Sequence, residues 1–291
     1  MGVRKPFVAG QFYEHEKKLL KQQVEKTFLH GWGPGLPDGD KNHGTVKGAI
    51  VPHAGIMFSG MCAAHSFKAI KESGDYDAFV VIGFSHSRLE SNHIVTSRLD
   101  WETPMGVAES DKEVVDEIIK DQHIDEDDQA MQYEHSIEVQ LPFLQYLYEE
   151  PKIVPILVGE GCDFKEAAKH IDAAIQKTGK NVCYIASTDF THYGPSFGFV
   201  PFEEDIQKSL YKLDEGAIEE IKVLNTKGFL DYIQSTAATI CGKNAVALLL
   251  ELLQEKVNRI EWLKYYTSGD LLEDYTNSVS YASVIFESIK L

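Results

Sequence analysis

Short apolar runs alternate with amphipathic stretches along most of the chain. The apolar or β-branched runs predict strands at 48–52, 78–83, 92–96, 153–158, 181–187, 262–267 and 279–286. Helical periodicity predicts helices at 14–29, 60–72, 111–120, 135–149, 164–177, 203–222, 227–234 and 242–256. Several strands are apolar throughout, which is typical of parallel strands covered on both faces. The pattern therefore predicts a three-layer α/β/α fold around a largely parallel or mixed sheet.

No internal repeat or low-complexity linker interrupts this alternation. The long irregular stretch at 30–46 is rich in Gly, Pro and Asp, and we interpret it as a surface loop rather than a domain boundary. The run at 279–286 predicts a last strand that returns to the same sheet. We therefore expect a single domain over residues 1–291.

Composition and charge narrow the classes of partner and the compartment. The formal net charge of −17 argues against nucleic acid and anionic membrane as partners. No apolar run is long enough to span a membrane, and the start of the chain lacks the apolar segment of a secretory signal. The four cysteines form no C-x-x-C pair. We therefore expect a reduced, cytoplasmic protein.

Histidines follow three of the predicted strands. The run 48–52 leads into His53, the run 78–83 leads to His86, and His192 comes shortly after the run 181–187. In open α/β sheets, ligands bind just beyond the carboxyl ends of the strands. A backbone carbonyl could satisfy any one of these histidines, but three at strand ends favour a shared site.

Three further features could contribute to that site. Cys241 precedes an Ala/Leu-rich helix, and a helix N-terminus favours a thiolate, although an inert buried cysteine is the alternative. Asp189 lies three residues before His192, where it could line the site or cap a turn. His135 and Glu138 are neighbours on one helical face, which a solvated first turn would also explain.

The donor atoms of these residues restrict the metal. Two imidazoles and a thiolate form a mixed nitrogen and sulfur set, which suits iron, copper or zinc and disfavours magnesium and calcium. His192 would then serve as an acid/base or contact the substrate. We expect one transition metal ion and no nucleotide cofactor.

At these residues the chain resembles the Memo family (mediator of ErbB2-driven cell motility), called AmmeMemoRadiSam system protein B in microbes. The motifs run in order across nearly the whole chain. They are Ala9-Gly10-x-Phe12-Tyr13, Pro52-His53-Ala54-Gly55 with Ser59-Gly60, Gly83-x-Ser85-His86, Glu134-His135-Ser136-Ile137-Glu138, Ser187-Thr188-Asp189-Phe190-Thr191-His192-Tyr193 and Cys241-Gly242.

The resemblance implies the fold of class III extradiol dioxygenases of the LigB type, in which two histidines and a glutamate hold Fe(II). It makes His53 and His86 the histidine ligands, places Cys241 where those enzymes have glutamate, and gives His192 the acid/base role beside Asp189. Iron or copper is the implied metal. The oxidisable thiolate argues against ring cleavage. The candidate pocket residues are His135, Glu138, Phe12 and Tyr13.

The resemblance leaves several functions and partners open. Animal members bind phosphotyrosine peptides, and microbial members are associated with a radical-SAM protein and an AMMECR-type protein. Phe12 stands here where animal members use Trp for peptide contact, Ile56 and Phe58 stand where tyrosines are common, and Phe84 stands where many members have Pro. The alternatives are a metal-dependent redox protein acting on a small molecule, a non-catalytic peptide- or partner-binding protein, and a zinc-dependent hydrolase.

Overall fold

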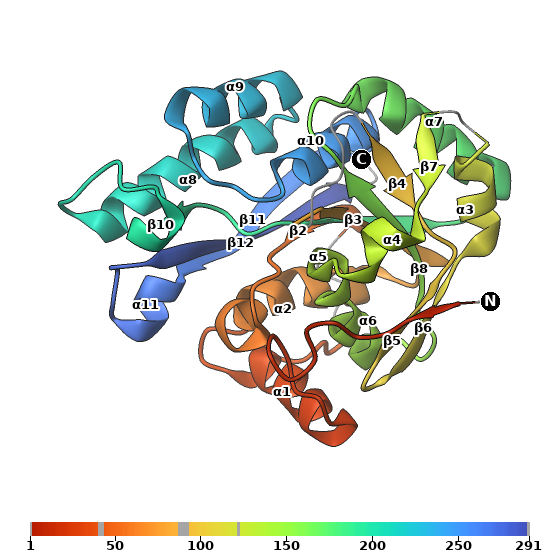
Figure 1. The fold of residues 1–291 in the computed structure, drawn as a ribbon, viewed down its shortest axis with the longest axis horizontal. Coiled ribbons are helices and arrows are strands. Elements are labelled where there is room, and N and C mark those ends of the chain that lie inside the picture. Colours follow the sequence, from red (N-terminus) through yellow and green to blue (C-terminus); the bar gives the residue numbers. More distant parts are fainter. Residues whose placement is uncertain (1, 40–43, 87–92, 121–122, 290–291) are drawn as a thin grey trace.

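The computed structural model describes residues 2–39, 44–86, 93–120 and 123–289. Within these ranges the strands join one 12-stranded sheet, whose main path runs β1-β5-β6-β8-β3-β9-β2-β12-β10, with β11 paired to β12 and β4 paired to β7 and β8 (Figure 1). The strands are β1 (Val3–Arg4), β2 (Thr45–Val51), β3 (Ala78–Phe84), β4 (Ile94–Thr96), β5 (Asp100–Thr103), β6 (Gly106–Ser110), β7 (Ile124–Glu126), β8 (Lys152–Val158), β9 (Val182–Ser187), β10 (His192–Tyr193), β11 (Arg259–Thr267) and β12 (Ser278–Ser288).

Helices cover both faces of this sheet (Figure 1). One face carries α1 (Lys17–Leu29), α2 (Ile56–Ser73) and α6 (Leu141–Leu147). The other carries α3 (Lys112–Ile118), α7 (Phe164–Thr178), α8 (Ile206–Lys222), α9 (Thr226–Thr236) and α10 (Lys243–Leu253). Short helices α4 (Asp128–Gln132), α5 (His135–Glu138) and α11 (Ser268–Leu272) lie in the connections, with a 3-10 turn at Pro195–Phe197.

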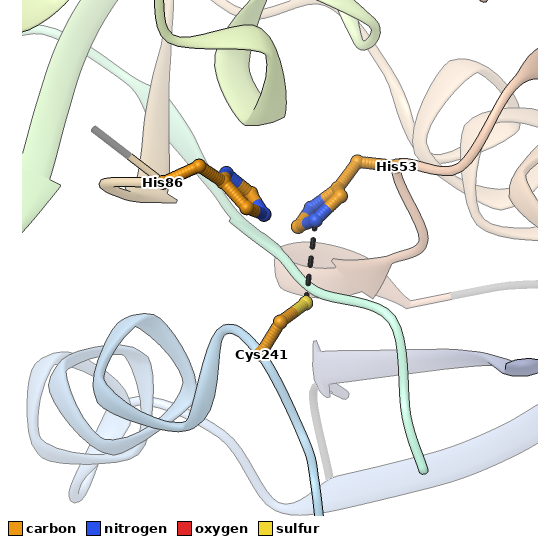
Figure 2. A group of neighbouring side chains, drawn as sticks. All are labelled: His53, His86 and Cys241. Carbon is orange, nitrogen blue, oxygen red and sulfur yellow. Dashed lines mark hydrogen bonds between the residues drawn. The ribbon is translucent and has the colours of Figure 1, made fainter. Parts of the chain in front are cut away.

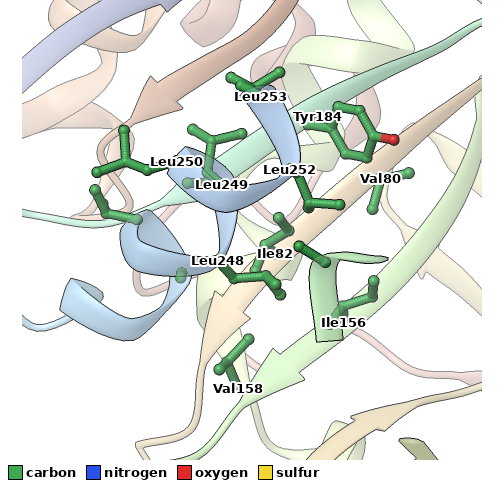
Figure 3. Close-up of a cluster of buried hydrophobic side chains, with 14 of the residues drawn as sticks. Val80, Ile82, Ile156, Val158, Tyr184, Leu248, Leu249, Leu250, Leu252 and Leu253 are labelled. Carbon is green, nitrogen blue, oxygen red and sulfur yellow. The ribbon is translucent and has the colours of Figure 1, made fainter. Parts of the chain in front are cut away.

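Strand β3 shows why the central strands are apolar throughout. Val80 and Ile82 pack under α10 on one face, whereas Phe79 and Val81 belong to the hydrophobic cluster on the other face (Figure 3). Successive side chains of a strand point to opposite faces, so a strand covered on both sides needs apolar residues at every position. Strands β8, β3, β9 and β2 are parallel, and β12 runs antiparallel to β2. The prediction of an α/β fold with a mixed sheet is confirmed.

The structure departs from the predicted elements in two ways. The helix predicted at 135–149 is divided into α5 and α6, because Pro142 has no N–H to donate and its ring conflicts with the carbonyl four residues earlier. The sequence did not predict β1, β5, β6, β7, β10, α4 or α11, because elements of two to five residues carry too little periodicity. Residue 92 of the predicted strand and residues 40–43 of the predicted loop lie outside the described residues.

The topology brings the three histidine-bearing segments to one edge of the sheet. Strand β9 lies between β3 and β2 and is parallel to both, so the carboxyl ends of all three face the same way.

The four cysteines are free. In the part of the chain that the structure describes, we find no helix that is both long and apolar enough for a membrane span.

Candidate metal centre

His53 and His86 meet beyond the ends of their strands. Strand β2 ends at Val51 and β3 at Phe84, so each histidine lies two residues past its strand. Their ring centroids are 5.3 Å apart and the rings are nearly perpendicular. Figure 2 shows both imidazoles and the Cys241 sulfur pointing toward one another from three separate segments.

The hydrogen bonds of His53 fix which of its nitrogens is free. Its Nδ1 lies 3.0 Å from Ser187 Oγ, and that hydroxyl donates its only proton to the Ser136 carbonyl at 2.6 Å. His53 Nδ1 must therefore donate to Ser187, which leaves a lone pair on Nε2, 3.3 Å from Cys241 Sγ. Burial, reinforced by the charge of His86, lowers the pKa of His53 to about 3, so the ring is neutral.

Glu134 engages Nδ1 of His86, as Ser187 engages Nδ1 of His53. The Glu134 carboxylate is fully buried, lies 3.0 Å from His86 Nδ1 and accepts the backbone N–H of His86 at 2.7 Å. Burial alone would raise the pKa of Glu134, but the hydrogen bond and charge of His86 lower it to about 2. The ionised carboxylate accepts the hydrogen bond of His86 Nδ1–H, so the lone pair of the neutral ring is on Nε2. Such carboxylate–histidine pairs orient metal-binding imidazoles.

Cys241 supplies the third donor atom, two residues before α10 begins. Its sulfur accepts the backbone N–H of Asp189 at 3.3 Å, and its thiol faces His53 Nε2. Burial, followed by the charge of Asp189, raises the pKa of Cys241 to about 12. The donor atoms of His53, His86 and Cys241 lie within 4.8 Å of one another. Two imidazole nitrogens and one sulfur at this spacing are a donor set that fits a transition metal, which would bind the cysteine as a thiolate.

Asp189 and His192 flank this set. Asp189 Oδ1 accepts the backbone N–H groups of His53 at 2.8 Å and Ala54 at 3.2 Å, so it holds the segment that carries His53. Burial raises the pKa of Asp189, and the charge of His192 opposes that rise. His192 Nδ1 lies 3.0 Å from the carbonyl of Thr239, which can only accept, so the free nitrogen of this ring is Nε2.

A cavity of about 400 Å³ adjoins these residues. Its polar side includes His53, His86, His135, Asp189 and His192. Its apolar side includes Phe12, Phe58, Phe197, Leu272, Val279 and Tyr281. The His135 ring lies 4.1 Å from that of His86 and 4.8 Å from that of Phe12, so two of the predicted pocket residues line the cavity. Burial, followed by the charge of His53, lowers the pKa of His135 to about 4.

The other two predicted pocket residues, Glu138 and Tyr13, are not among the residues that line this cavity. Glu138 is fully buried and binds the Arg4 guanidinium, the Tyr13 hydroxyl and the backbone N–H groups of Phe7 (3.0 Å) and Val8 (3.1 Å). A solvated first turn is therefore the wrong description of this position. Glu138 instead anchors the N-terminal segment to α5.

The contact between Glu134 and the His86 ring was not predicted from the sequence. The only signal was the position of Glu134 directly before His135 in the resemblance motif. Ser187 was likewise quoted as part of a motif without a role. Both residues touch a histidine ring through contacts between distant parts of the chain, 48 and 134 residues apart.

Comparison with known proteins agrees with this arrangement of motifs. The family model described as Memo-like protein matches residues 4–285. A MEMO1 family protein of Methanopyrus kandleri is 36% identical over 289 residues, covering 97% of this chain and 98% of the relative. A MEMO1 family protein of Methanobrevibacter smithii is 37% identical over 295 residues, covering 98% of this chain and 100% of the relative.

Among solved structures, the crystal structure of an uncharacterized protein from Escherichia coli K12 superposes with a TM-score of 0.55. It covers 82% of this chain and 99% of its own, at 13% sequence identity, which is a likeness of fold alone. The family match and the two full-length relatives are much more specific. The chain therefore belongs to the Memo family.

Proposed function

We propose that this protein binds one redox-active transition metal ion, iron or copper, through His53, His86 and Cys241, and uses it on a small molecule held in the adjoining cavity. The observation that carries the proposal is the convergence of the three donor atoms within 4.8 Å. The opposite nitrogen of each imidazole is already engaged, by Ser187 and by Glu134. Both rings are therefore oriented to offer Nε2.

The donor set selects among metals. A thiolate with two imidazoles suits copper, iron and zinc, and it gives magnesium and calcium too few oxygen ligands. Iron or copper would supply one-electron chemistry at this site. Zinc would supply an activated water for hydrolysis, and metal analysis separates that alternative from the proposal.

Side chains around the three donor atoms would position His53, transfer protons and set which ligands the cavity prefers. Asp189 holds the backbone of His53 in place through two N–H groups. His192, whose ring is fixed by Thr239, can hold or deliver a proton at Nε2 to a molecule in the cavity. The apolar wall of the same cavity favours a ligand with an apolar part.

Metal analysis after anaerobic purification tests the proposal. Wild type is expected to contain or take up close to one equivalent of iron or copper, and His53→Ala is expected to lose that uptake. His65→Ala is the matched control, because His65 is a half-buried histidine whose ring contacts the Trp32 carbonyl. Equal uptake by wild type and His53→Ala, or zinc alone in the wild type, would contradict the proposal.

A second candidate is non-catalytic binding of a peptide or partner protein. The observation that favours it is the exposure of two apolar side chains that line the cavity, Phe197 at 42% and Leu272 at 59%. Such side chains at a cavity commonly receive a ligand. If this hypothesis is correct, Leu272→Ser weakens binding of the peptide or partner protein, and removal of metal leaves that binding unchanged. A metal requirement for capture favours the redox function.

A further inference from the structure

Three redox-active aromatic side chains lead away from the metal cavity. Tyr281 lines the cavity, and its ring lies 5.5 Å from that of Tyr266, its direct partner across strands β11 and β12. The Tyr266 ring lies 5.1 Å from the indole of Trp32. Tyr281 and Tyr266 are buried, at 2% and 3% exposure, whereas Trp32 is half-buried in the loop after α1. The series therefore connects the cavity to the surface.

These residues belong to a small hydrophobic cluster that is separate from the two large cores. The position of Trp32 is held at two points. Its carbonyl lies 3.0 Å from His65 Nε2, and its indole packs on Tyr266 with the ammonium of Lys264 5.9 Å above the ring. The Tyr266 hydroxyl also has structural hydrogen bonds, because it donates to the Phe58 carbonyl at 2.7 Å and accepts the Cys62 N–H at 3.2 Å. The feature that supports a further role is the unbroken series of three contacting oxidisable rings from the cavity to the surface.

We propose that Tyr281, Tyr266 and Trp32 form a relay that carries oxidising equivalents from the cavity to the surface. The relay rests on the proposed redox function, because it needs an oxidant generated beside Tyr281. Its role is protective: it draws a one-electron oxidant away from Cys241, whose thiolate is open to irreversible oxidation.

The chemistry balances with hydrogen peroxide as the oxidant and a thiol as the final reductant. Iron held at this site would supply one electron to hydrogen peroxide, which gives hydroxide and a hydroxyl radical. That radical takes a hydrogen atom from the Tyr281 phenol and becomes water. The rings of the three residues contact one another, whereas the Tyr266 hydroxyl donates to the Phe58 carbonyl. An electron therefore passes from the Tyr266 ring to the Tyr281 radical and from the Trp32 indole to the Tyr266 radical. Each donor gives up its proton and each acceptor takes one up, so every step moves the equivalent of one hydrogen atom. A thiol in solution then returns a hydrogen atom to Trp32, and two thiyl radicals combine to a disulfide.

The chain contains an internal control for this relay. Trp262, Tyr265 and Tyr211 form a second series, with ring centroids 5.7 Å and 4.5 Å apart. Trp262 is half-buried like Trp32. Among the described residues that line the cavity, however, none of these three appears. The two series share residue types and spacing and differ in whether they begin at the cavity.

The test maps oxidised side chains by peptide mass spectrometry after a stoichiometric peroxide pulse on the iron-loaded protein. Oxidation is expected to be greater at Trp32 than at Trp262. Hydroxyl radicals made in bulk solution around the metal-free protein should remove that preference. In Tyr266→Phe the ring is kept but cannot be oxidised in this way. The excess at Trp32 should then be lost, and oxidation should rise at Cys241 and Tyr281.

Iron binding is measured separately on each protein, together with its melting temperature. Suppose that wild type and Tyr266→Phe bind iron equally and that Trp32 is oxidised equally in both. That result would overturn the relay and leave the metal site intact. Absence of iron binding by the wild type would overturn the relay, and absence of both iron and copper binding would overturn the proposed function as well. Rapid-freeze electron paramagnetic resonance adds a direct readout, since the tryptophan radical of wild type should be absent from Trp32→Phe and retained in Trp262→Phe.

Discussion

The carboxylate of Glu134 contacts His86 twice, at ring Nδ1 (3.0 Å) and at the backbone N–H (2.7 Å). One buried side chain thus sets both the tautomer of the imidazole and the position of the turn that carries it. Glu134 also accepts the N–H of Ser136 and so caps α5. The orientation of the His86 ring is therefore coupled to the local fold of a segment that lies outside the His53, His86 and Cys241 set.

Glu134→Gln is expected to weaken metal affinity about 10- to 100-fold, the usual effect of losing a carboxylate behind a metal-binding histidine. The amide keeps the shape of the side chain but is a poorer acceptor for the Nδ1 proton of His86. Competition with a chelator of known affinity measures the change. Glu72→Gln is the matched control, because Glu72 is a buried glutamate on α2 that pairs with Lys68. Equal affinities for both variants would refute the coupling.

Glu138→Gln is expected to lower the free energy of unfolding by about 3–5 kcal/mol, because it leaves the buried Arg4 guanidinium without its counter-charge. The same carboxylate holds the backbone of Phe7 and Val8, so the N-terminal segment should loosen first. Urea denaturation gives the size of the loss, and hydrogen exchange locates it. Arg4→Met combined with Glu138→Leu should recover part of the stability. A loss below about 1 kcal/mol would mean that water relieves the uncompensated charge.

The lowered pKa of Asp270 predicts that the stability of the protein depends on pH. Burial alone would raise its pKa, but hydrogen bonds, led by that of the Tyr275 hydroxyl, lower it below the ordinary value of 3.8. A depressed carboxyl pKa stabilises the fold above about pH 4, and this contribution is lost as the pH falls through the folded-state pKa. Asp270 also closes the capping box of α11 with Thr267.

Asp270→Asn is therefore expected to be less stable than wild type by about 1 kcal/mol at pH 7. The difference should shrink as the pH falls below about 4 toward 3, because the wild-type contribution is lost as the pH falls through the folded-state pKa. Urea denaturation at the two pH values measures both quantities. Glu273→Gln removes an exposed carboxylate that follows the same helix and should change stability little at either pH. A difference between wild type and Asp270→Asn that grows on acidification would reverse the expected sign.

Local patterns predicted much of the fold and part of the site. His53 and His86 were predicted at strand ends on one edge of the sheet, because continuous apolar runs are typical of parallel strands and parallel strands share one carboxyl edge. Their strands β2 and β3 are not adjacent, since β9 lies between them. The contacts that complete the site depend on long-range packing. Arg4 meets Glu138 across 134 residues of sequence, and His53 Nε2 meets Cys241 across 188. No periodicity encodes such pairs, so their roles become visible only when the chain is folded.

Cys241→Ser is expected to change which metal the site prefers. A soft thiolate favours copper(I), and a hydroxyl is a weak ligand for that ion. Replacing the thiolate with a hydroxyl therefore lowers the affinity for copper(I) more than the affinity for a harder ion such as iron(II). The ratio of copper(I) affinity to iron(II) affinity should therefore fall, even though both affinities decrease. Anaerobic titrations with competing chelators give the two values. Cys162→Ser is the control, since Cys162 is a half-buried free cysteine whose thiol contacts the carbonyls of His93 and Gly159. An unchanged ratio in Cys241→Ser would show that the sulfur does not ligate the ion, and His53 and His86 would then need a different third donor.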